Sequence, residues 1–289
     1  MKVGVAMPQA AEDGAGTWPE IAALAAQLES GGADSLWLSD HFLYRPADAP
    51  EAGYHEPWAL LAALAATTSR IELGTLVLAT SFRPPGVVAK MAATADEIAG
   101  GRLILGLGCG WHEPEYRAFG YPFDHRVGRF EETLRIIVPL LRGERVTFAG
   151  TWTSVEDAVL LPPPRRPPIP VMVAAKGDRM LRLTARHADA WQTAWFGTPD
   201  DRFAERRGRL LAACDAEGRD PATLEVTVGV EVRGPDDGPG ANLPLDAAAI
   251  ADALGAWAAE GVAHVQIAVA QSTPSTFDVV LEGIRRSSR

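Results

Sequence analysis

The chain has 289 residues, of which 47% are apolar, and a formal net charge of −10 at pH 7. This acidic balance, without any cluster of Lys and Arg among aromatic side chains, argues against a nucleic-acid partner. The two cysteines, Cys109 and Cys214, have neither CxxC nor Cys/His metal spacing, residues 1–9 do not resemble a signal peptide, and no apolar stretch could span a bilayer. We therefore expect a cytoplasmic protein with no membrane association.

Short apolar runs alternate with longer helical stretches along the chain. In the first half, four strands are expected at Val3–Met7, Ser35–Ser39, Ile71–Leu78 and Leu103–Leu107. The helices expected after them are Trp18–Ser30, Pro57–Ser69, Pro85–Ala99 and Arg126–Leu141. Pairs of glycines follow the first and third of these helices, and Pro57 suits a first helical turn.

The second half repeats the pattern after an interruption. Val146–Leu160 is interpreted as a strand pair, and the proline-rich Pro162–Pro170 as a stiff approach to the next strand, which gives an excursion at about residues 144–168. Four more strands are expected at Val171–Ala174, Ala188–Gln192, Leu224–Val230 and Val262–Ala268. Helices are expected at Arg179–Arg186, at Asp200–Glu217 and after each of the last two strands. Eight such units predict an α/β fold, a (β/α)₈ TIM barrel formed by residues 1–289 as a single domain.

In such a barrel, functional residues follow the C-terminal ends of the strands. Asp40 and His41 follow the second expected strand and offer a proton carrier beside a carboxylate that could bias its charge. Alternatively, Asp40 caps the strand end and His41 hydrogen-bonds a loop carbonyl. Gly106, Gly108 and Gly110 lack the Rossmann spacing, but they allow either a flat ring or a neighbouring segment to approach the backbone closely.

Lys176-Gly177-Asp178-Arg179 immediately precedes an expected helix. Free backbone N–H groups at a helix start favour a phosphate, with Lys176 or Arg179 adding charge, although Asp178 could act simply as the N-cap. With the glycine run, this segment predicts a pocket for a flat, phosphate-bearing cofactor, and Cys109 stands where it could contact that group.

The other histidines give weaker signals. His112 and Glu115 could form a metal pair, but no third ligand stands at a predictable spacing, so no metal is expected. His187 and His264 are expected to be structural. His55 could touch a substrate or lie exposed in a loop.

Three segments resemble one known family. Gly101–Tyr116 (GRLILGLGCGWHEPEY) resembles the GRF-x-LG-x-G-x-GW…EY stretch of the luciferase-like monooxygenase family, which has FMN-dependent and deazaflavin-dependent members. Asp34–His41 is similar to the family's second strand, and Arg179–Trp191 is similar to its RxLRLAARYADGW segment. The resemblance spans nearly the whole chain.

The resemblance implies a homodimer and a set of cofactor contacts. It places these contacts at Asp40, His41, Leu76, Val77, Ala79, Gly108, Cys109, Gly110, Ala175, Lys176, Gly177, Asp178, Arg179 and Met180. The deazaflavin branch further implies a non-proline cis peptide at Leu76–Val77. Two departures stand out, because Trp111 replaces a glutamate of the sugar-phosphate dehydrogenase branch and Lys176 replaces a glycine of the commoner phosphate loop.

These observations predict an oxidoreductase acting on a small molecule, with His41 and Asp40 as the catalytic residues. We favour coenzyme F420 and hydride transfer, because the chain is compact and its bias towards Arg over Lys suits a high-GC actinobacterium. The alternative is an FMN-dependent monooxygenase, which uses O₂ and could need a flavin reductase as partner. Remoter alternatives are a metal-dependent hydrolase, although Pro8-Gln9-Ala10 occupies the usual H-x-H position, and a non-catalytic cofactor binder.

Overall fold

Eight parallel strands form a closed barrel in the computed structural model, which describes residues 1–10, 16–45, 51–165, 168–234 and 243–287. The strands are β1 (Lys2–Ala6), β2 (Ser35–Leu38), β5 (Glu72–Thr75), β7 (Leu103–Gly108), β10 (Val171–Ala174), β11 (Ala190–Phe196), β12 (Glu225–Arg233) and β14 (His264–Val269). They are hydrogen-bonded in chain order, β14 pairs with β1, and β7 pairs with β10. The predicted (β/α)₈ barrel is confirmed.

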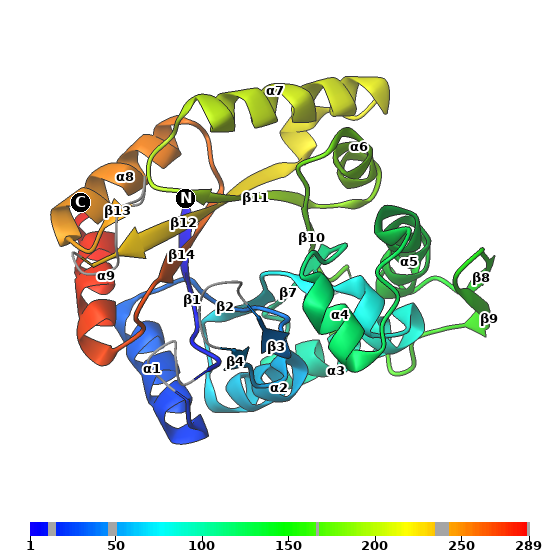
Figure 1. Ribbon diagram of the computed structural model, residues 1–289, viewed down its shortest axis with the longest axis horizontal. Coiled ribbons are helices and arrows are strands. Elements are labelled where there is room, and N and C mark those ends of the chain that lie inside the picture. The colour runs from blue at the N-terminus through cyan, green and yellow to red at the C-terminus, as the bar shows by residue number, and fades with distance from the viewer. Residues whose placement is uncertain (11–15, 46–50, 166–167, 235–242, 288–289) are drawn as a thin grey trace.

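Helices surround the strands on the outside of the barrel (Figure 1). They are α1 (Trp18–Gly31), α2 (Pro57–Thr67), α3 (Pro85–Ala99), α5 (Arg126–Leu141), α6 (Asp178–His187), α7 (Asp201–Ala216), α8 (Ala247–Ala259) and α9 (Pro274–Ser287). At three of their starts the N-cap residue itself is acidic and accepts backbone N–H groups, with Glu56 at α2, Asp200 at α7 and Asp246 at α8. None of the helices in the described part of the chain is long and apolar enough to cross a membrane.

Smaller elements account for the main differences from the sequence-based prediction. They are β3 (Leu43–Tyr44), β4 (Ala52–Gly53), β6 (Leu78–Ala79), η2 (Thr80–Phe82), α4 (Glu113–Phe119), β8 (Val146–Ala149), β9 (Ser154–Ala158), η3 (Pro221–Thr223) and β13 (Leu243–Pro244). The expected strand pair is the β8–β9 hairpin, which extends beyond α5 in Figure 1. Arg166 and Pro167 of the expected stiff segment lie outside the described residues.

The prediction of one continuous third strand at Ile71–Leu78 is wrong. It is divided into β5 and β6, and both of these pair with β7. Between them the Leu76–Val77 peptide bond is cis, as the resemblance to the deazaflavin branch implied. The sixth and seventh expected strands begin and end a few residues later than predicted, at Ala190–Phe196 and Glu225–Arg233.

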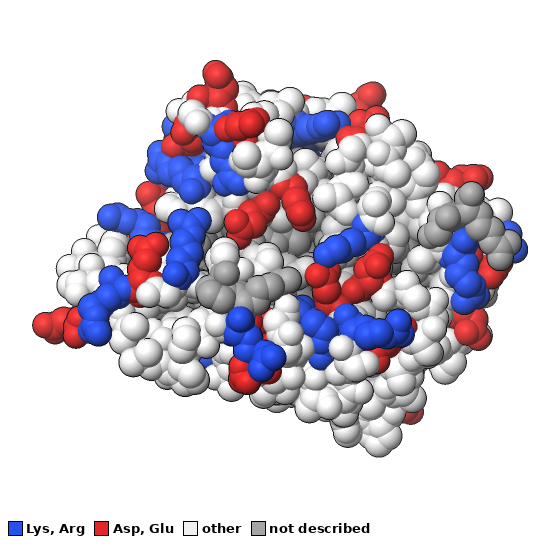
Figure 2. All heavy atoms as spheres, turned by 180° about the vertical axis from the view of Figure 1, so that it is seen from behind, with Lys and Arg blue, Asp and Glu red and all other residues white. Residues whose placement is uncertain are grey.

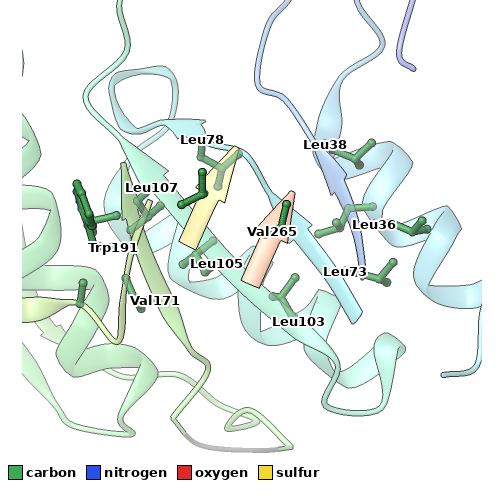
Figure 3. Packing of buried hydrophobic residues seen from close by; sticks show 14 of the residues in the cluster. Leu36, Leu38, Leu73, Leu78, Leu103, Leu105, Leu107, Val171, Trp191 and Val265 are labelled. Atoms are coloured by element: carbon green, nitrogen blue, oxygen red, sulfur yellow. The ribbon is translucent and has the colours of Figure 1, made fainter. Parts of the chain in front are cut away.

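Alternation along the strands divides the core into two parts. The outer part joins strands to helices, and Figure 3 shows some of its members, Leu36, Leu38, Leu73, Leu103, Leu105 and Leu107. Trp37 lies between two of these leucines in the chain and belongs instead to a separate cluster with Met172 and Ala190. Because neighbouring strand residues point to opposite faces, Trp37 fills the inside of the barrel.

Charged side chains of both signs share the molecular surface. On the face drawn in Figure 2, Lys and Arg lie next to Asp and Glu rather than in a stripe of one sign. This face therefore offers no continuous basic track for a phosphate backbone.

Candidate active site

A cavity of about 390 Å³ lies at the C-terminal ends of the barrel strands. Every residue predicted to contact the cofactor lines it, except Asp178 and Arg179. The lining residues that were not predicted are Trp111, Glu115, Ala174, Gln192, Ala194 and Trp195. Segments distant in the sequence thus meet at the barrel end where this fold carries its functional residues.

Asp40 is fully engaged with groups other than His41. Its carboxylate accepts hydrogen bonds from both terminal nitrogens of Arg83, at 2.8 and 3.0 Å, and from the backbone N–H of Ala79 at 2.9 Å. Arg83 also donates to Glu56 at 2.6 Å. The interpretation of Asp40 as the group that biases His41 is therefore revised, because this carboxylate joins the ends of β2 and β6 as a positioning residue.

Glu115 is the carboxylate that contacts His41. His41 Nδ1 lies 3.3 Å from Glu115 Oε1, while Glu115 Oε2 accepts the backbone N–H groups of Phe42 at 2.6 Å and Leu43 at 3.1 Å. Burial of the Glu115 side chain opposes ionisation, but the hydrogen bonds from His41 and these amides hold its pKa below the ordinary value. An ionised acceptor requires a proton on His41 Nδ1, which leaves Nε2 free to exchange a proton in the cavity.

His112 does not join Glu115 in a metal pair. Its Nε2 accepts the backbone N–H of Arg45 at 3.0 Å, and burial lowers its pKa, which favours the neutral imidazole. Among the described residues, no three His, Cys, Asp or Glu side chains come together in a way that could hold a metal ion.

The backbone of the glycine run is held from two sides. Gly110 has a φ of +70°, and a Cβ there would lie 1.8 Å from the hydroxyl oxygen of Tyr116. The Tyr116 hydroxyl donates to the Cys109 carbonyl at 3.2 Å, and Arg126 donates to the Gly110 carbonyl at 2.6 Å. Burial raises the pKa of the Cys109 thiol, so it stays protonated as a small wall residue. This segment offers a fixed surface for a flat ring.

The start of α6 forms the other end of the cavity. Lys176 and Gly177 line it, and desolvation together with the charges of Arg206 and Arg202 lowers the pKa of Lys176. Asp178 instead pairs with Arg209 at 2.7 Å, and Arg179 pairs with Glu131 at 2.7 Å. The positive charge expected from Arg179 is thus directed away from the cavity. Arg202 and Arg206 lie four residues apart on α7 and therefore share one face of that helix. This spacing could have indicated from the sequence that α7 presents positive charge near Lys176.

Gln192 stands out among the residues that sequence reasoning missed. Its side chain is 5% exposed and lines the cavity, yet its Nε2 has no hydrogen-bond partner among the residues that the structure describes. A buried amide nitrogen without a partner is destabilising on its own. Its position indicates a ligand that offers a hydrogen-bond acceptor at this point.

Comparisons with known proteins agree with this fold. The model of the luciferase-like monooxygenase family matches residues 1–237. The chain is 35% identical over 226 residues to the F420-dependent glucose-6-phosphate dehydrogenase of Kineococcus radiotolerans, which covers 75% of this chain and 65% of that protein. It is also 35% identical over 258 residues to the phthiodiolone/phenolphthiodiolone dimycocerosates ketoreductase of Mycobacterium kansasii, covering 81% of this chain and 70% of that protein.

A solved structure shares the fold over nearly its whole length. The match to an F420-dependent secondary alcohol dehydrogenase in complex with an F420–acetone adduct has a TM-score of 0.81 at 18% identity, over 99% of both chains. The class of protein follows from the family match. The chain belongs to the luciferase-like monooxygenase family, and it spans 65% of the length of the Kineococcus relative.

Proposed function

We propose that this protein is an oxidoreductase that uses coenzyme F420 to transfer a hydride to or from a small-molecule substrate. The observation that carries the proposal is the arrangement of one cavity, with an anion-binding helix start at one end, a fixed backbone surface in the middle and the His41–Glu115 pair at the other end. The names of the two curated relatives, an F420-dependent dehydrogenase and a ketoreductase, support it.

The residues present fit a flat ring that carries a phosphate-bearing side chain. Lys176 and the backbone amides at the start of α6 would hold the phosphate, since both favour negative charge. Leu76, Val77 and the Gly108–Gly110 segment would contact the ring, and the unpartnered Gln192 Nε2 would donate to an acceptor on the ring edge. When bound, the deazaflavin supplies or accepts the hydride.

The chain itself supplies a proton and the geometry for the reaction. His41 would give a proton from Nε2 to a substrate oxygen, or take one from it, while Glu115 holds the imidazole from the opposite nitrogen. The Asp40–Arg83 pair would fix the backbone at Ala79 and thereby the wall against which the ring lies.

Titration of the purified protein with F420, followed by the fluorescence of the coenzyme, tests the proposal. We expect saturable binding of F420 and turnover that does not need oxygen. Tight binding of FMN with none of F420 would contradict the proposal. That result would favour an FMN-dependent monooxygenase, which needs O₂ and reduced flavin, for example from a flavin reductase.

A homodimer is proposed on separate grounds. Helix α2 is apolar on almost all sides, and a groove of about 240 Å³ between α2 and α3 is lined by Trp58, Ala62, Met91 and Ile98 among others. Ile98 is 44% exposed and Val87 on the same helix is 49% exposed. A helix that is apolar all round is normally buried, which supports a second copy of the chain as its cover. Light scattering should give the mass of a dimer for the wild type and of a monomer for Ile98→Asp.

A further inference from the structure

Charge is distributed unevenly in the candidate active site. Lys176 is the only cation among the described residues that line the cavity, and it stands at the start of α6. Nearby arginines are engaged elsewhere, because Arg83 pairs with Asp40 and Glu56, and Arg126 donates to the Gly110 carbonyl. At the His41 end, an imidazolium ready to donate from Nε2 is balanced by the ionised Glu115 on its other nitrogen, so the described lining residues offer no uncompensated cation there. A phosphate or carboxylate on the substrate would gain no attraction at this end.

Two tryptophans occupy the wall of the same cavity. Trp111 is 60% exposed and Trp195 is 42% exposed, and both line the cavity. The Trp111 ring lies 5.8 Å from the His41 ring at an interplanar angle of 81°, and 6.0 Å from the Tyr44 ring. Large aromatic surfaces left open to water beside a reactive group are typical of a binding site for an apolar ligand.

The position of Trp195 depends on a glycine in the neighbouring strand. A Cβ added to Gly229 of β12 would lie 2.7 Å from Trp195 Cε3 and 2.7 Å from the Ala194 Cβ. The indole therefore packs directly on the backbone of β12, and any side chain at position 229 would displace it. This close contact fixes the indole before a ligand arrives.

We propose that the substrate is an uncharged, apolar ketone, or the corresponding secondary alcohol, whose body packs against Trp111 and Trp195. This inference rests on the proposed F420-dependent function. In the reductive direction, the carbonyl carbon gains a hydride from the reduced coenzyme and the carbonyl oxygen gains a proton from His41 Nε2. The products are the secondary alcohol and the oxidised coenzyme, and the reverse reaction returns both groups.

An apolar ketone differs in charge and polarity from glucose 6-phosphate, the substrate named for the Kineococcus relative. Glucose 6-phosphate is hydrophilic and doubly charged, so its transfer to an aromatic wall beside Glu115 would lose hydration without a compensating cation. An apolar ketone carries no charge that needs a cation. The hydrophobic effect favours transfer of its apolar body from water to the aromatic wall, and its oxygen accepts the proton of His41 Nε2.

Calorimetric titration of the F420-loaded protein with acetone, cyclohexanone, acetophenone and glucose 6-phosphate tests the inference without relying on turnover. We expect the Kd to fall from acetone to acetophenone and no binding of glucose 6-phosphate. Trp111→Ala and Trp195→Ala should each weaken acetophenone binding by roughly tenfold or more. In steady-state assays the same variants should raise KM for acetophenone more than they lower kcat.

Three controls make the result specific. Trp18→Ala removes a tryptophan that is 37% exposed at the start of α1, outside the cavity, and should leave ketone binding unchanged. Gly229→Ala should weaken acetophenone binding by displacing Trp195 while both tryptophans are retained. The circular dichroism spectrum of Trp111→Ala should match that of the wild type, since the change removes an indole that is 60% exposed.

The outcomes distinguish this inference from the proposed function. F420 binding combined with tighter binding of glucose 6-phosphate than of any ketone would overturn the inference alone. Unchanged acetophenone binding in both Trp111→Ala and Trp195→Ala, or no ketone binding at all by the loaded wild-type protein, would overturn it as well. A wild-type protein that fails to bind F420 would overturn the proposed function and this inference with it.

Discussion

The two ends of the barrel differ in how the polar side chains there are hydrogen-bonded within the chain. At the N-terminal end, the hydroxyl oxygen of Ser35 lies 2.7 Å from His264 Nε2 and accepts the indole N–H of Trp37 at 2.7 Å. At the C-terminal end, the buried Gln192 Nε2 has no hydrogen-bond partner in the described part of the chain, and the indoles of Trp111 and Trp195 are exposed. The named polar groups at the N-terminal end thus bind one another within the chain, whereas those named at the C-terminal end line a cavity.

This difference assigns stability to one end and ligand binding to the other. Burial lowers the pKa of His264 to about 3, so its imidazole is neutral and serves as a hydrogen-bonding part of the interior. His41 instead lines a cavity, and within the described segments no hydrogen bond is made by its second nitrogen, a geometry suited to proton transfer. Polar groups that a protein leaves without partners are informative about ligands because their burial is otherwise unfavourable.

The largest expected effect is at the C-terminal end of the barrel, where the candidate active site lies. His41→Ala should lower turnover by about 10²–10⁴-fold, because the substrate oxygen loses its positioned proton carrier. F420 binding and the circular dichroism spectrum should be retained. His55→Ala is the matched control, since His55 lies outside the cavity lining with its Nε2 2.7 Å from the Gly16 carbonyl. Equal turnover in the wild type and His41→Ala would show that His41 only anchors its loop.

Breaking the ion pair beneath the cavity should affect stability strongly. Arg83→Met leaves the Asp40 carboxylate, which is 3% exposed, without its cation, and should reduce the free energy of unfolding by about 3–5 kcal/mol. Urea denaturation measures this loss. Adding Asp40→Asn to the same chain removes the uncompensated charge and should recover part of the stability. If the double variant is less stable than Arg83→Met, the penalty does not arise from that charge.

His264, at the N-terminal end of the barrel, should govern part of the pH dependence of stability. His264 has a folded-state pKa of about 3 against an ordinary value of 6.5, so the unfolded chain binds its proton more readily. The stabilisation is therefore complete above pH 6.5 and is lost as the pH falls, by about 2 kcal/mol between pH 6.5 and roughly pH 5.

Urea denaturation across this range should show a shallower loss in His264→Gln than in the wild type. His125→Gln serves as the control, because the side chain of His125 is 65% exposed. An identical slope in the wild type and His264→Gln would show that other groups control the pH dependence.

The barrel and most of the cavity lining could be predicted because they depend on local pattern. Alternating apolar runs indicate the strands, and the fold places the ends of those strands together. The contact between His41 and Glu115 could not be predicted, since it joins residues 74 positions apart through the short helix α4. That helix was missed because seven residues, with Pro114 in the first turn, give too short an apolar pattern to distinguish from a loop.

The direction in which the side chains at the start of α6 point could not be predicted from the sequence either. Lys176-Gly177-Asp178-Arg179 is a basic, glycine-containing run, but whether each member faces the cavity depends on how α6 is rotated against the barrel. In the structure Asp178 and Arg179 form ion pairs with Arg209 and Glu131 on neighbouring helices. The sequence contains the partners of these pairs without indicating which of them would meet.

The smallest expected effect tests how α6 is rotated against the barrel, which decides whether Lys176 or Arg179 faces the cavity. Lys176→Ala should weaken F420 binding by roughly fivefold, because Lys176 is an exposed charge that acts on a phosphate through partly screened attraction. Arg179→Ala should change the Kd little, since its guanidinium pairs with Glu131 outside the cavity. Fluorescence titrations of both variants at low and high salt separate the two cases, because the difference between Lys176→Ala and the wild type should shrink as salt is added. A greater loss in Arg179→Ala than in Lys176→Ala would mean that α6 presents Arg179 to the bound coenzyme and that the simple charge pattern of the sequence was the better guide.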